Sequence, residues 1–256
     1  MKIENYGVGE RCREVMRLLT EWASIEETNA PGRIILLPIP TSRDGIHLCG
    51  SDKLLHEVVS EVDYGELVVG YSIPSYDTEY IRSRGAFVFD AAADELFLEE
   101  NAYLTALGTL EYLLSEHRCV PSDMHVGIIG YGRIGSALLR ILLFLGAKIR
   151  IYTSKNLTRV ELGENGVESR YIDYANPTLG DTADLDVLIN TAPTRLGSCF
   201  DGGVPCGIRV IELASGDNFA GVEGVVRLPS IPEKNYPKSA GRAYFHAIQR
   251  YMREVF

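Results

Sequence analysis

The central part of the chain combines two short apolar runs with a stretch of helical periodicity. Residues 126–129 form an apolar run that is typical of a strand buried in a parallel sheet. Apolar residues then recur with helical spacing from Leu138 to Leu145, and Gly146 stands where helices commonly end. A second apolar run covers residues 149–152. This order predicts a strand–helix–strand unit of about 30 residues.

The chain before this unit alternates between helical and strand patterns. Residues 8–25 repeat apolar side chains at three- and four-residue steps, which predicts an amphipathic helix. No strand is expected within residues 1–10, and the acidic stretch 90–100 is expected to lie before a helix, outside it. The predicted elements are a helix at 8–25, strands at 34–37, 67–71 and 86–89, a helix at 54–62 and a helix from Asn101 to about Ser115.

Strand patterns dominate the remainder of the chain. Predicted strands lie at 167–172, 183–190, 210–213 and 224–228. Three prolines within 229–237 predict an extended segment, after which Lys238–Gly241 is expected to cap a last helix. Strands that alternate with helices predict an α/β fold with a Rossmann-type, doubly wound parallel sheet.

The glycines after the first central strand are spaced as in a dinucleotide-binding turn. Gly130 would permit the tight turn, Gly132 would let the backbone approach a pyrophosphate, and Gly135 would let helix and strand pack closely. The free N–H groups at the helix start would face the phosphates. A tight turn without a ligand is the alternative. The predicted cofactor residues in this region are Gly130, Tyr131, Gly132, Arg133, Ile134 and Gly135, with Asn190, Thr191 and Pro193 after a later strand.

The end of the second central strand favours NADP over NAD. An NAD site usually has an acidic residue about 20 residues beyond the glycines, where it binds the ribose hydroxyls. No acidic residue occurs between Gly135 and Glu161. The strand instead runs into Thr153, Ser154 and Lys155, with Arg159 close behind, and hydroxyls with cations suit a 2′-phosphate. A solvated loop is the alternative, and NAD stays possible.

Composition excludes several classes of function. The net charge of −10 argues against nucleic acid or an anionic membrane as a main partner. The five cysteines are scattered without CxxC spacing, which indicates free thiols in a reducing cytoplasm and neither a disulfide framework nor a zinc site. No apolar signal core, membrane span or HExxH or GxSxG motif is present. We therefore predict a cytoplasmic protein without a metal.

Candidate substrate ligands follow the first predicted strand, at an edge where α/β sheets bind ligands. Arg43 there and Lys238 near the C-terminus could each hold a carboxylate, Arg as a bidentate fork and Lys as a point charge. A solvated turn, with Arg43 paired to Asp44 or another surface acid and Lys238 only capping a helix, is the alternative. No catalytic residue is assigned, although His47 is the best placed of the five isolated histidines. The predicted substrate-binding residues are Thr41, Ser42, Arg43, Thr105, Lys238 and Ser239.

Six segments occur in a fixed order along the chain. They are Leu37–Gly45, Glu100–Ala106, the glycine fingerprint, Ile189–Pro193, Glu212–Ser215 and Tyr236–Gly241. Together they resemble the A chain of dipicolinate synthase, and the resemblance covers residues 33–256. The Leu-Pro-Ile-Pro loop, the Asn-Ala-x-x-Thr-Ala segment and the Pro-Lys-Ser-Ala-Gly tail carry most of its specificity, whereas the fingerprint and the Asn-Thr-x-Pro segment are shared with many dehydrogenases.

The resemblance implies a two-domain protein similar to the D-2-hydroxyacid dehydrogenases. Residues 1–101 with 239–256 would form a smaller α/β domain on the substrate side, completed by the C-terminal helix, and residues 102–238 the dinucleotide-binding domain. That family works with a flavoprotein, the B chain, in the cytoplasm of sporulating cells. Its substrate, from the lysine pathway, is a cyclic imine with two carboxylates and a hydroxyl. Here the family's opening strand, with its Gly-Asp-x-Arg-type turn, is expected to be missing, and Ser239 replaces the commoner Thr.

Three functional hypotheses follow. The first is an NADP-dependent oxidoreductase of dipicolinate synthase type, expected to form a homo-oligomer. The second is a relative that oxidises or reduces another small carboxylate. The third is a nucleotide-binding protein without catalytic activity, which a missing N-terminal strand would favour.

Overall fold

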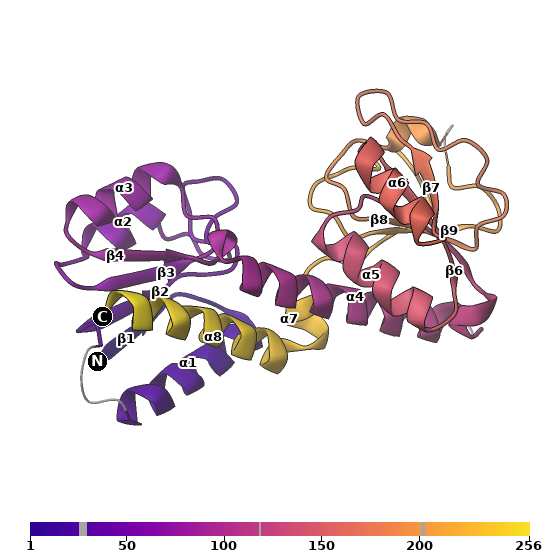
Figure 1. Ribbon diagram of the computed structural model, residues 1–256. Coiled ribbons are helices and arrows are strands. Elements are labelled where there is room, and N and C mark those ends of the chain that lie inside the picture. The colour runs from indigo at the N-terminus through magenta and orange to yellow at the C-terminus, as the bar shows by residue number, and fades with distance from the viewer. Residues whose placement is uncertain (26–29, 118, 201–202) are drawn as a thin grey trace. The chain divides into compact units, whose positions relative to one another are not determined.

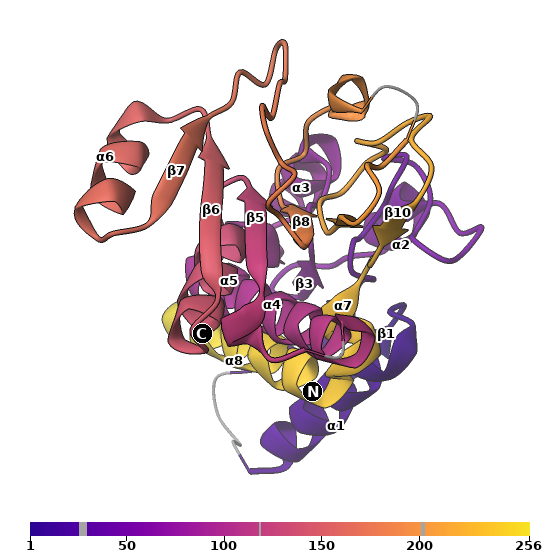
Figure 2. The same cartoon turned by 90° about the vertical axis from the view of Figure 1, so that its right-hand side faces the viewer.

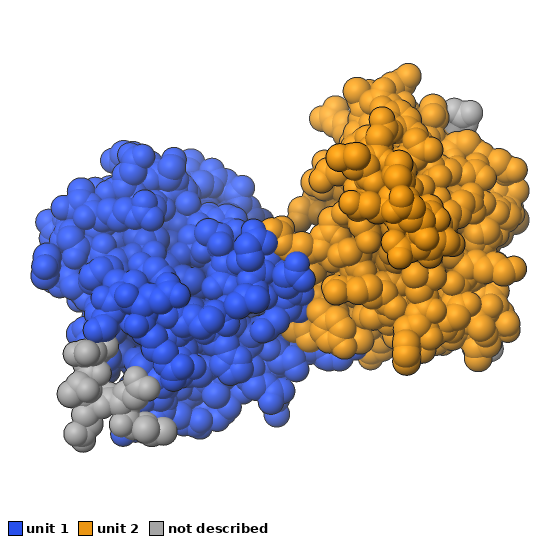
Figure 3. Space-filling view, in the orientation of Figure 1, with its two compact units in different colours: residues 1–101, 232–256 blue, residues 102–231 orange. Residues whose placement is uncertain are grey.

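The chain folds into two compact units. The computed structural model describes residues 1–25, 30–117, 119–200 and 203–256. Unit 1 contains Met1–Asn101 and Pro232–Phe256, and unit 2 contains Ala102–Ile231 (Figure 3). The chain therefore returns to unit 1 at Pro232, earlier than the expected residue 239.

Unit 1 is built on a four-stranded parallel sheet (Figure 1). Its strands, in spatial order, are β1 (Lys2–Asn5), β2 (Arg33–Leu36), β3 (Leu67–Gly70) and β4 (Phe87–Asp90). Its helices are α1 (Gly9–Ile25), α2 (Leu55–Ser60), α3 (Ser75–Ser83) and α8 (Pro237–Val255). Successive strand residues face opposite sides: Ile34 and Leu36 pack on the side of α1 and α8, whereas Ile35 packs on the side of α2.

The expectation that the opening strand is missing was wrong. Residues Lys2–Asn5 pair in parallel with Arg33–Leu36 as strand β1. The sequence pattern conceals it because Ile3 is the single apolar residue of the strand, which lies at a sheet edge. Backbone pairing forms the strand, and Arg33 on β2 adds an ion pair to Glu4 at 2.7 Å. The third hypothesis, a protein without catalytic activity, loses the observation that favoured it.

Helix boundaries differ from the predictions at three places. Helix α4 (Glu95–His117) begins within the acidic stretch, because Asp94 accepts a hydrogen bond from the amide of Phe97 at 2.7 Å and negative charge suits a helix start. The segment 229–237 is not wholly extended, since it contains α7 (Ile231–Asn235). Lys238 lies inside the first turn of α8, which starts at Pro237, so the expected cap is already helix.

Unit 2 has a six-stranded parallel sheet in the order β10-β9-β8-β5-β6-β7, and Figure 2 shows β7, β6, β5 and β8 following one another in this order. This order, with its reversal between β5 and β8, confirms the doubly wound Rossmann-type prediction. Helix α4 continues from unit 1 into unit 2 and packs with α5 on one face of the sheet. The strands are β5 (His125–Ile129), β6 (Lys148–Thr153), β7 (Glu168–Tyr171), β8 (Val187–Asn190), β9 (Arg209–Glu212) and β10 (Val225–Arg227), and the other helices are α5 (Arg133–Phe144) and α6 (Asn156–Glu164).

Candidate functional site

The glycine turn joins β5 to α5 at the carboxyl edge of the unit 2 sheet. Gly130 has φ +92°, and its amide donates to the carbonyl of Tyr152 at 2.9 Å, which fixes the turn to β6. A Cβ at Gly135 would collide with the carbonyl oxygen of Gly130. The fold itself therefore requires glycine at both positions.

Gly132 differs from its two neighbouring glycines. Apart from Gly132, its chain neighbours and the adjoining helix backbone, no atom of the described residues lies within 4 Å of the position that a Cβ at Gly132 would take. Its φ of −93° is also open to any residue. The fold thus gives no reason for glycine here, whereas a phosphate group approaching the backbone would.

The first turn of α5 is open to an anion. Its N-cap position is Gly132, so no side chain caps the helix, and no acidic residue lies in the first turn. Buried Ala137, Leu138 and Leu142 hold the helix against the sheet. The amides at the start of a helix and the positive end of its dipole together attract phosphate.

The residues predicted for the 2′-phosphate gather where β6 ends. Thr153 is buried and accepts a hydrogen bond from the amide of Lys155 at 3.3 Å, while Ser154 and Lys155 are exposed. Lys155 is the N-cap residue of α6, and Arg159 lies one turn later, so the two cations belong to the start of a helix rather than to a loop. Within the described residues, the buried Nε of Arg159 has no hydrogen-bond partner.

Asn190 and Thr191 shape the same edge from β8. The hydroxyl of Thr191 donates to the carbonyl of Ile129 at 2.9 Å and so clamps the glycine turn. The side chain of Asn190 bonds the backbone of Ala192 in both directions, donating at 2.9 Å and accepting at 3.0 Å. Both side chains are thus committed to the protein, and Pro193 beside them is exposed.

Glu212 is a buried carboxyl group that the sequence analysis did not single out. It ends β9 beside Asn190, whose side-chain amide donates to it at 3.0 and 3.2 Å, and it also accepts from the amide of Ala214 at 2.8 Å. Burial raises the pKa of Glu212, and the bond from Asn190 opposes that change. An acid that ends an apolar strand at the carboxyl edge is the signal that could have identified it.

In unit 1, three predicted substrate residues share the loop after β2. Thr41 is buried and exchanges two hydrogen bonds with Tyr71, both at 2.9 Å. The hydroxyl of Ser42 donates to Asp44 at 3.0 Å. Arg43 forms no ion pair within the described residues, and it borders a pocket of about 470 Å³. Arg43 therefore does not pair with Asp44, contrary to the alternative.

The other predicted substrate residues lie elsewhere. Lys238 is exposed on the first turn of α8, and Ser239 accepts a weak bond from Arg242 at 3.5 Å. Thr105 is buried in α4 and belongs to unit 2, whereas the other five belong to unit 1.

The loop with Arg43 borders the residue just before α1, and the start of α8 packs on the first turn of α1. A Cβ at Gly50, in the loop, would touch Val8 at 3.6 Å. Gly241 of α8 packs so closely on α1 that a Cβ would approach the carbonyl of Arg11 to 2.9 Å. The carboxyl edge of the unit 1 sheet therefore brings these segments to the same helix end.

Arg11 is another residue that the sequence analysis missed. It lies in the first turn of α1, its side chain is buried, and its Nε is 3.1 Å from a carboxylate oxygen of Glu233 on α7. Burial lowers the pKa of Arg11, an effect that Glu233 opposes. This ion pair ties the returning chain to the first helix of unit 1.

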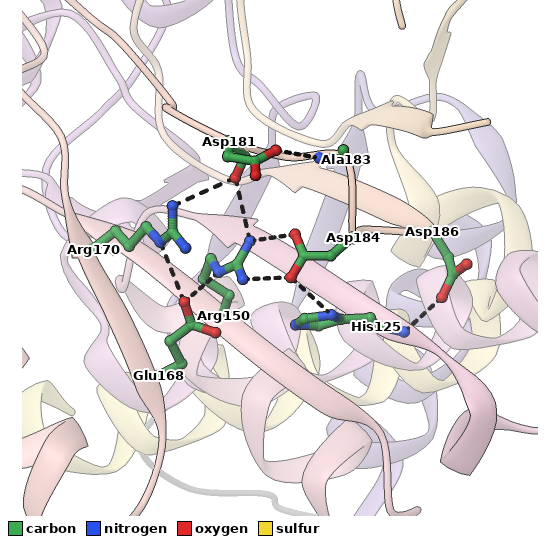
Figure 4. A network of polar contacts seen from close by, with 8 residues as sticks. All are labelled: His125, Arg150, Glu168, Arg170, Asp181, Ala183, Asp184 and Asp186. Atoms are coloured by element: carbon green, nitrogen blue, oxygen red, sulfur yellow. Dashed lines mark hydrogen bonds and ion pairs between the residues drawn. The ribbon is translucent and has the colours of Figure 1, made fainter. Parts of the chain in front are cut away.

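A cluster of charged residues lies near the amino ends of β5, β6 and β7 (Figure 4). Arg150, with a side chain only 4% exposed, donates to both oxygens of Asp184 at 2.8 and 2.6 Å and to Glu168 at 2.6 Å. These bonds lower the pKa of Asp184 to about 2 and also lower that of Glu168. Arg170 bonds Glu168 at 3.2 Å. The cluster satisfies its own charges and leaves none for a ligand.

The structure is similar to the A chains of two dipicolinate synthases. No protein-family model and no curated protein sequence matches the chain. The A chain of dipicolinate synthase from Bacillus halodurans aligns with a TM-score of 0.74 at 20% identity, over 98% of this chain and 97% of that chain. The A chain of the Bacillus subtilis enzyme aligns with a TM-score of 0.74 at 17% identity, over 99% and 96%.

Dehydrogenases share the same arrangement. A D-lactate dehydrogenase of Salmonella aligns with a TM-score of 0.57 at 13% identity, over 98% of this chain and 96% of that chain. At these identities the likeness establishes the fold: the chain has the two-unit, dehydrogenase-type architecture that the A chain of dipicolinate synthase also has. The resemblance stated from six segments is confirmed at this level, and the two alignments cover 98% and 99% of this chain. Among the described residues, no helix combines the length and apolar character needed to cross a bilayer.

Proposed function

We propose that the chain is an NADP-dependent oxidoreductase similar to the A chain of dipicolinate synthase, acting on a small cyclic dicarboxylate. One observation carries the proposal: the fold does not explain why residue 132 is glycine. Gly132 lies at the start of α5, where no side chain caps the helix. The pyrophosphate would bind there, against backbone amides. A bound nicotinamide supplies the hydride chemistry, and the protein has to bind, orient and exchange a proton.

The preference for NADP rests on the end of β6. Lys155 is exposed and makes no ion pair within the described residues, and Arg159 keeps a buried Nε without a partner there. Two cations beside Thr153 and Ser154 are suited to the extra phosphate of NADP, whereas an acidic residue that would bind the ribose of NAD is missing from this strand end.

The proposed substrate ligands are Arg43 and Lys238. Both are cations without an ion pair in the described chain, and their segments contact Val8, just before α1, and the first turn of α1, respectively. A substrate with two carboxylates needs two such groups, with the hydroxyl of Ser239 nearby as a neutral donor, whereas that of Ser42 already donates to Asp44. Thr41 already bonds Tyr71, and Thr105 lies in the other unit, so these two are the weaker members of the set.

The partners follow from the same proposal. We expect a cytoplasmic homo-oligomer that works with a flavoprotein, the B chain of the synthase, in sporulation, with a substrate from the lysine pathway. A relative that acts on another small carboxylate is the second candidate, because the cation pair recognises carboxylates rather than a particular ring.

One experiment tests the function. The purified full chain is mixed with a cyclic imine dicarboxylate and either NADP⁺ or NAD⁺, and reduced nicotinamide is followed by fluorescence. We expect turnover with NADP⁺, and we expect an Arg43→Ala, Lys238→Ala double variant to lose it by about tenfold or more while binding NADP⁺ normally. No turnover by the wild-type chain with a panel of such dicarboxylates, with and without the flavoprotein, would contradict the proposal.

A further inference from the structure

The loop between β2 and α2 is held rigidly at its base. The amide of Cys49 donates to the carbonyl of Thr41 at 2.9 Å, which closes the loop, and Thr41 is itself bonded to Tyr71. The amide of Leu55, the first residue of α2, donates to the carbonyl of Ile46 at 2.8 Å. The side chains between residues 42 and 48 are therefore presented by a fixed backbone.

Asp44 is the centre of this loop. One of its carboxylate oxygens accepts from the amides of Ile46 and His47, both at 2.8 Å, and from the hydroxyl of Ser42 at 3.0 Å. The other oxygen lies 2.8 Å from Nδ1 of His47. These bonds, first of all that from the His47 ring, lower the pKa of Asp44, so it stays a carboxylate at neutral pH.

The pairing fixes which nitrogen of His47 is available. A carboxylate only accepts hydrogen bonds, so Nδ1 carries the proton of the neutral ring. Nε2 is then the acceptor, and it has no hydrogen-bond partner in the described chain. An imidazole with Nδ1 held by a carboxylate and Nε2 open is the arrangement of a general base.

His47 lines the same pocket of about 470 Å³ as Arg43, the proposed carboxylate ligand, and Asp44 borders it too. The other charged or titratable groups that line it are Cys49 and Asp52, and Lys53 is turned away, over the ring of Tyr6 at 5.0 Å. A carboxylate held by Arg43 would bring the rest of a small substrate to His47.

A second Asp–His pair in unit 1 provides a comparison. Nδ1 of His56 lies 2.9 Å from Asp77, whose side chain is only 5% exposed on α3. The His56 ring, however, packs against the rings of Tyr76 and Tyr80 at 5.3 and 5.0 Å between centroids. That pair joins α2 to α3, whereas the loop pair joins no two elements.

We infer that His47, oriented by Asp44, is the proton acceptor of the reaction, a role that rests on the proposed function. In the oxidation, the substrate loses a hydride to NADP⁺, forming NADPH, and a proton to Nε2 of His47, while one new double bond forms in the substrate. The resulting imidazolium is stabilised by Asp44 and returns its proton to water. In the reverse direction His47 donates the proton.

The kinetic test compares three variants of the full chain: His47→Gln, Asp44→Asn and, as the matched control, His56→Gln. We expect His47→Gln to lower kcat by about 10²–10⁴-fold, with an unchanged dissociation constant for NADP⁺ and loss of the acidic limb of the pH–rate profile. Asp44→Asn should lower kcat less, and His56→Gln should not change it. Wild-type kcat in His47→Gln would overturn the inference.

A second measurement does not depend on turnover. Imidazole nitrogens are followed by ¹⁵N NMR while pyridine-2,6-dicarboxylate is added, with acetate as the monocarboxylate control. We expect the Nε2 resonance of His47 to shift with saturation, and that of His56 to stay. An unchanged His47 resonance, or a shift that acetate reproduces, would overturn the inference even if the enzyme turns over. Failure of turnover together with a saturable shift would count against the proposed function alone.

Discussion

The two ends of the unit 2 sheet carry similar charged residues with opposite consequences. Near the amino ends of β5–β7, Arg150 donates hydrogen bonds to Asp184, Glu168 and a backbone carbonyl (Figure 4). At the carboxyl end of β6, Lys155 and Arg159 have no ion pair within the described residues. Charges that satisfy one another stabilise a fold, and charges without partners are available to a ligand.

The same difference separates the glycines of the turn. Gly130 and Gly135 are required by the chain's own backbone, and Gly132 is not. For the charged residues and for the glycines, the residue type alone does not tell a structural role from a ligand-binding one, and the surroundings of the residue do. Substitutions in both groups, the residues bonded within the protein and the residues without partners, test this difference.

The largest effect is expected from Gly132→Val. The branched side chain would occupy the space of the pyrophosphate, so nucleotide affinity should fall about a thousand-fold, which corresponds to about 4 kcal/mol. The melting temperature should hardly change, because apart from its neighbours in the chain nothing in the described residues lies within 4 Å of the new Cβ. Calorimetry and thermal unfolding measure the two effects. Gly32→Val, which also points into open space, is the control in unit 1. Near-normal nucleotide binding by Gly132→Val would show that the glycine fingerprint is only a tight turn without a role in binding.

Arg150→Ala should have the opposite profile. We expect a loss of about 2–3 kcal/mol in the free energy of unfolding, below the roughly 3–5 kcal/mol of a fully buried pair, because Glu168 and Asp184 are about half exposed. The dissociation constant for NADP⁺ should be unchanged. Urea unfolding and calorimetry on the same sample test both expectations. The control is Arg17→Ala, which removes the ion pair between the exposed Arg17 and Glu14 on α1 and should leave the unfolding midpoint nearly unaltered. Weaker nucleotide binding in Arg150→Ala would break the comparison.

Lys155→Ala should affect binding without affecting stability. Losing one charge–phosphate contact should weaken NADP⁺ binding by about 1.5–3 kcal/mol and leave NAD⁺ binding as it was. Lys148, at the amino end of the same strand and also exposed, supplies the matched control, and Lys148→Ala should change neither. Equal wild-type dissociation constants for the two nucleotides in calorimetry would contradict the assignment to NADP.

The smallest effect concerns pH. The pKa of Asp184 is lowered from its usual 3.8 to about 2, chiefly by Arg150. A depressed carboxyl pKa contributes stability that is present above the unfolded value and is lost as pH falls through the folded one. Stability should therefore decrease between about pH 4 and pH 2, and this decrease should be weaker in Arg150→Ala. Denaturant unfolding across that range measures it, and parallel curves for the two proteins would show that Arg150 is not responsible.

Periodicity and composition predicted much of the architecture. The central strand–helix–strand unit with its glycines was recognisable because buried strands and an amphipathic helix leave strong local patterns, and the predicted parallel sheet is confirmed. Strand β1 left no such pattern, since one apolar residue in four cannot mark a strand. Helix α3 was missed for a similar reason, because only two of its residues are buried.

The candidate site was predictable in part. The polar residues at the end of β2 were expected at the carboxyl edge of one parallel sheet, and those at the ends of β6 and β8 at the carboxyl edge of another, and the structure places them there. Their hydrogen-bond partners were not predictable. The pairs Asn190–Glu212 and Arg11–Glu233 join residues far apart in the chain, and a sequence pattern carries no signal for such contacts.

By itself, the sequence determined the elements with strong periodicity and the glycine turn. It also determined that cations, and no acidic residue, follow β6. These features depend on local spacing and residue chemistry. The tertiary structure decided which of those groups remain available. Thr41, Asn190 and Thr191 are occupied by the protein's own backbone, whereas Arg43, Lys155 and Gly132 are not. Whether a polar group is satisfied depends on neighbours that only the folded chain brings within hydrogen-bond distance.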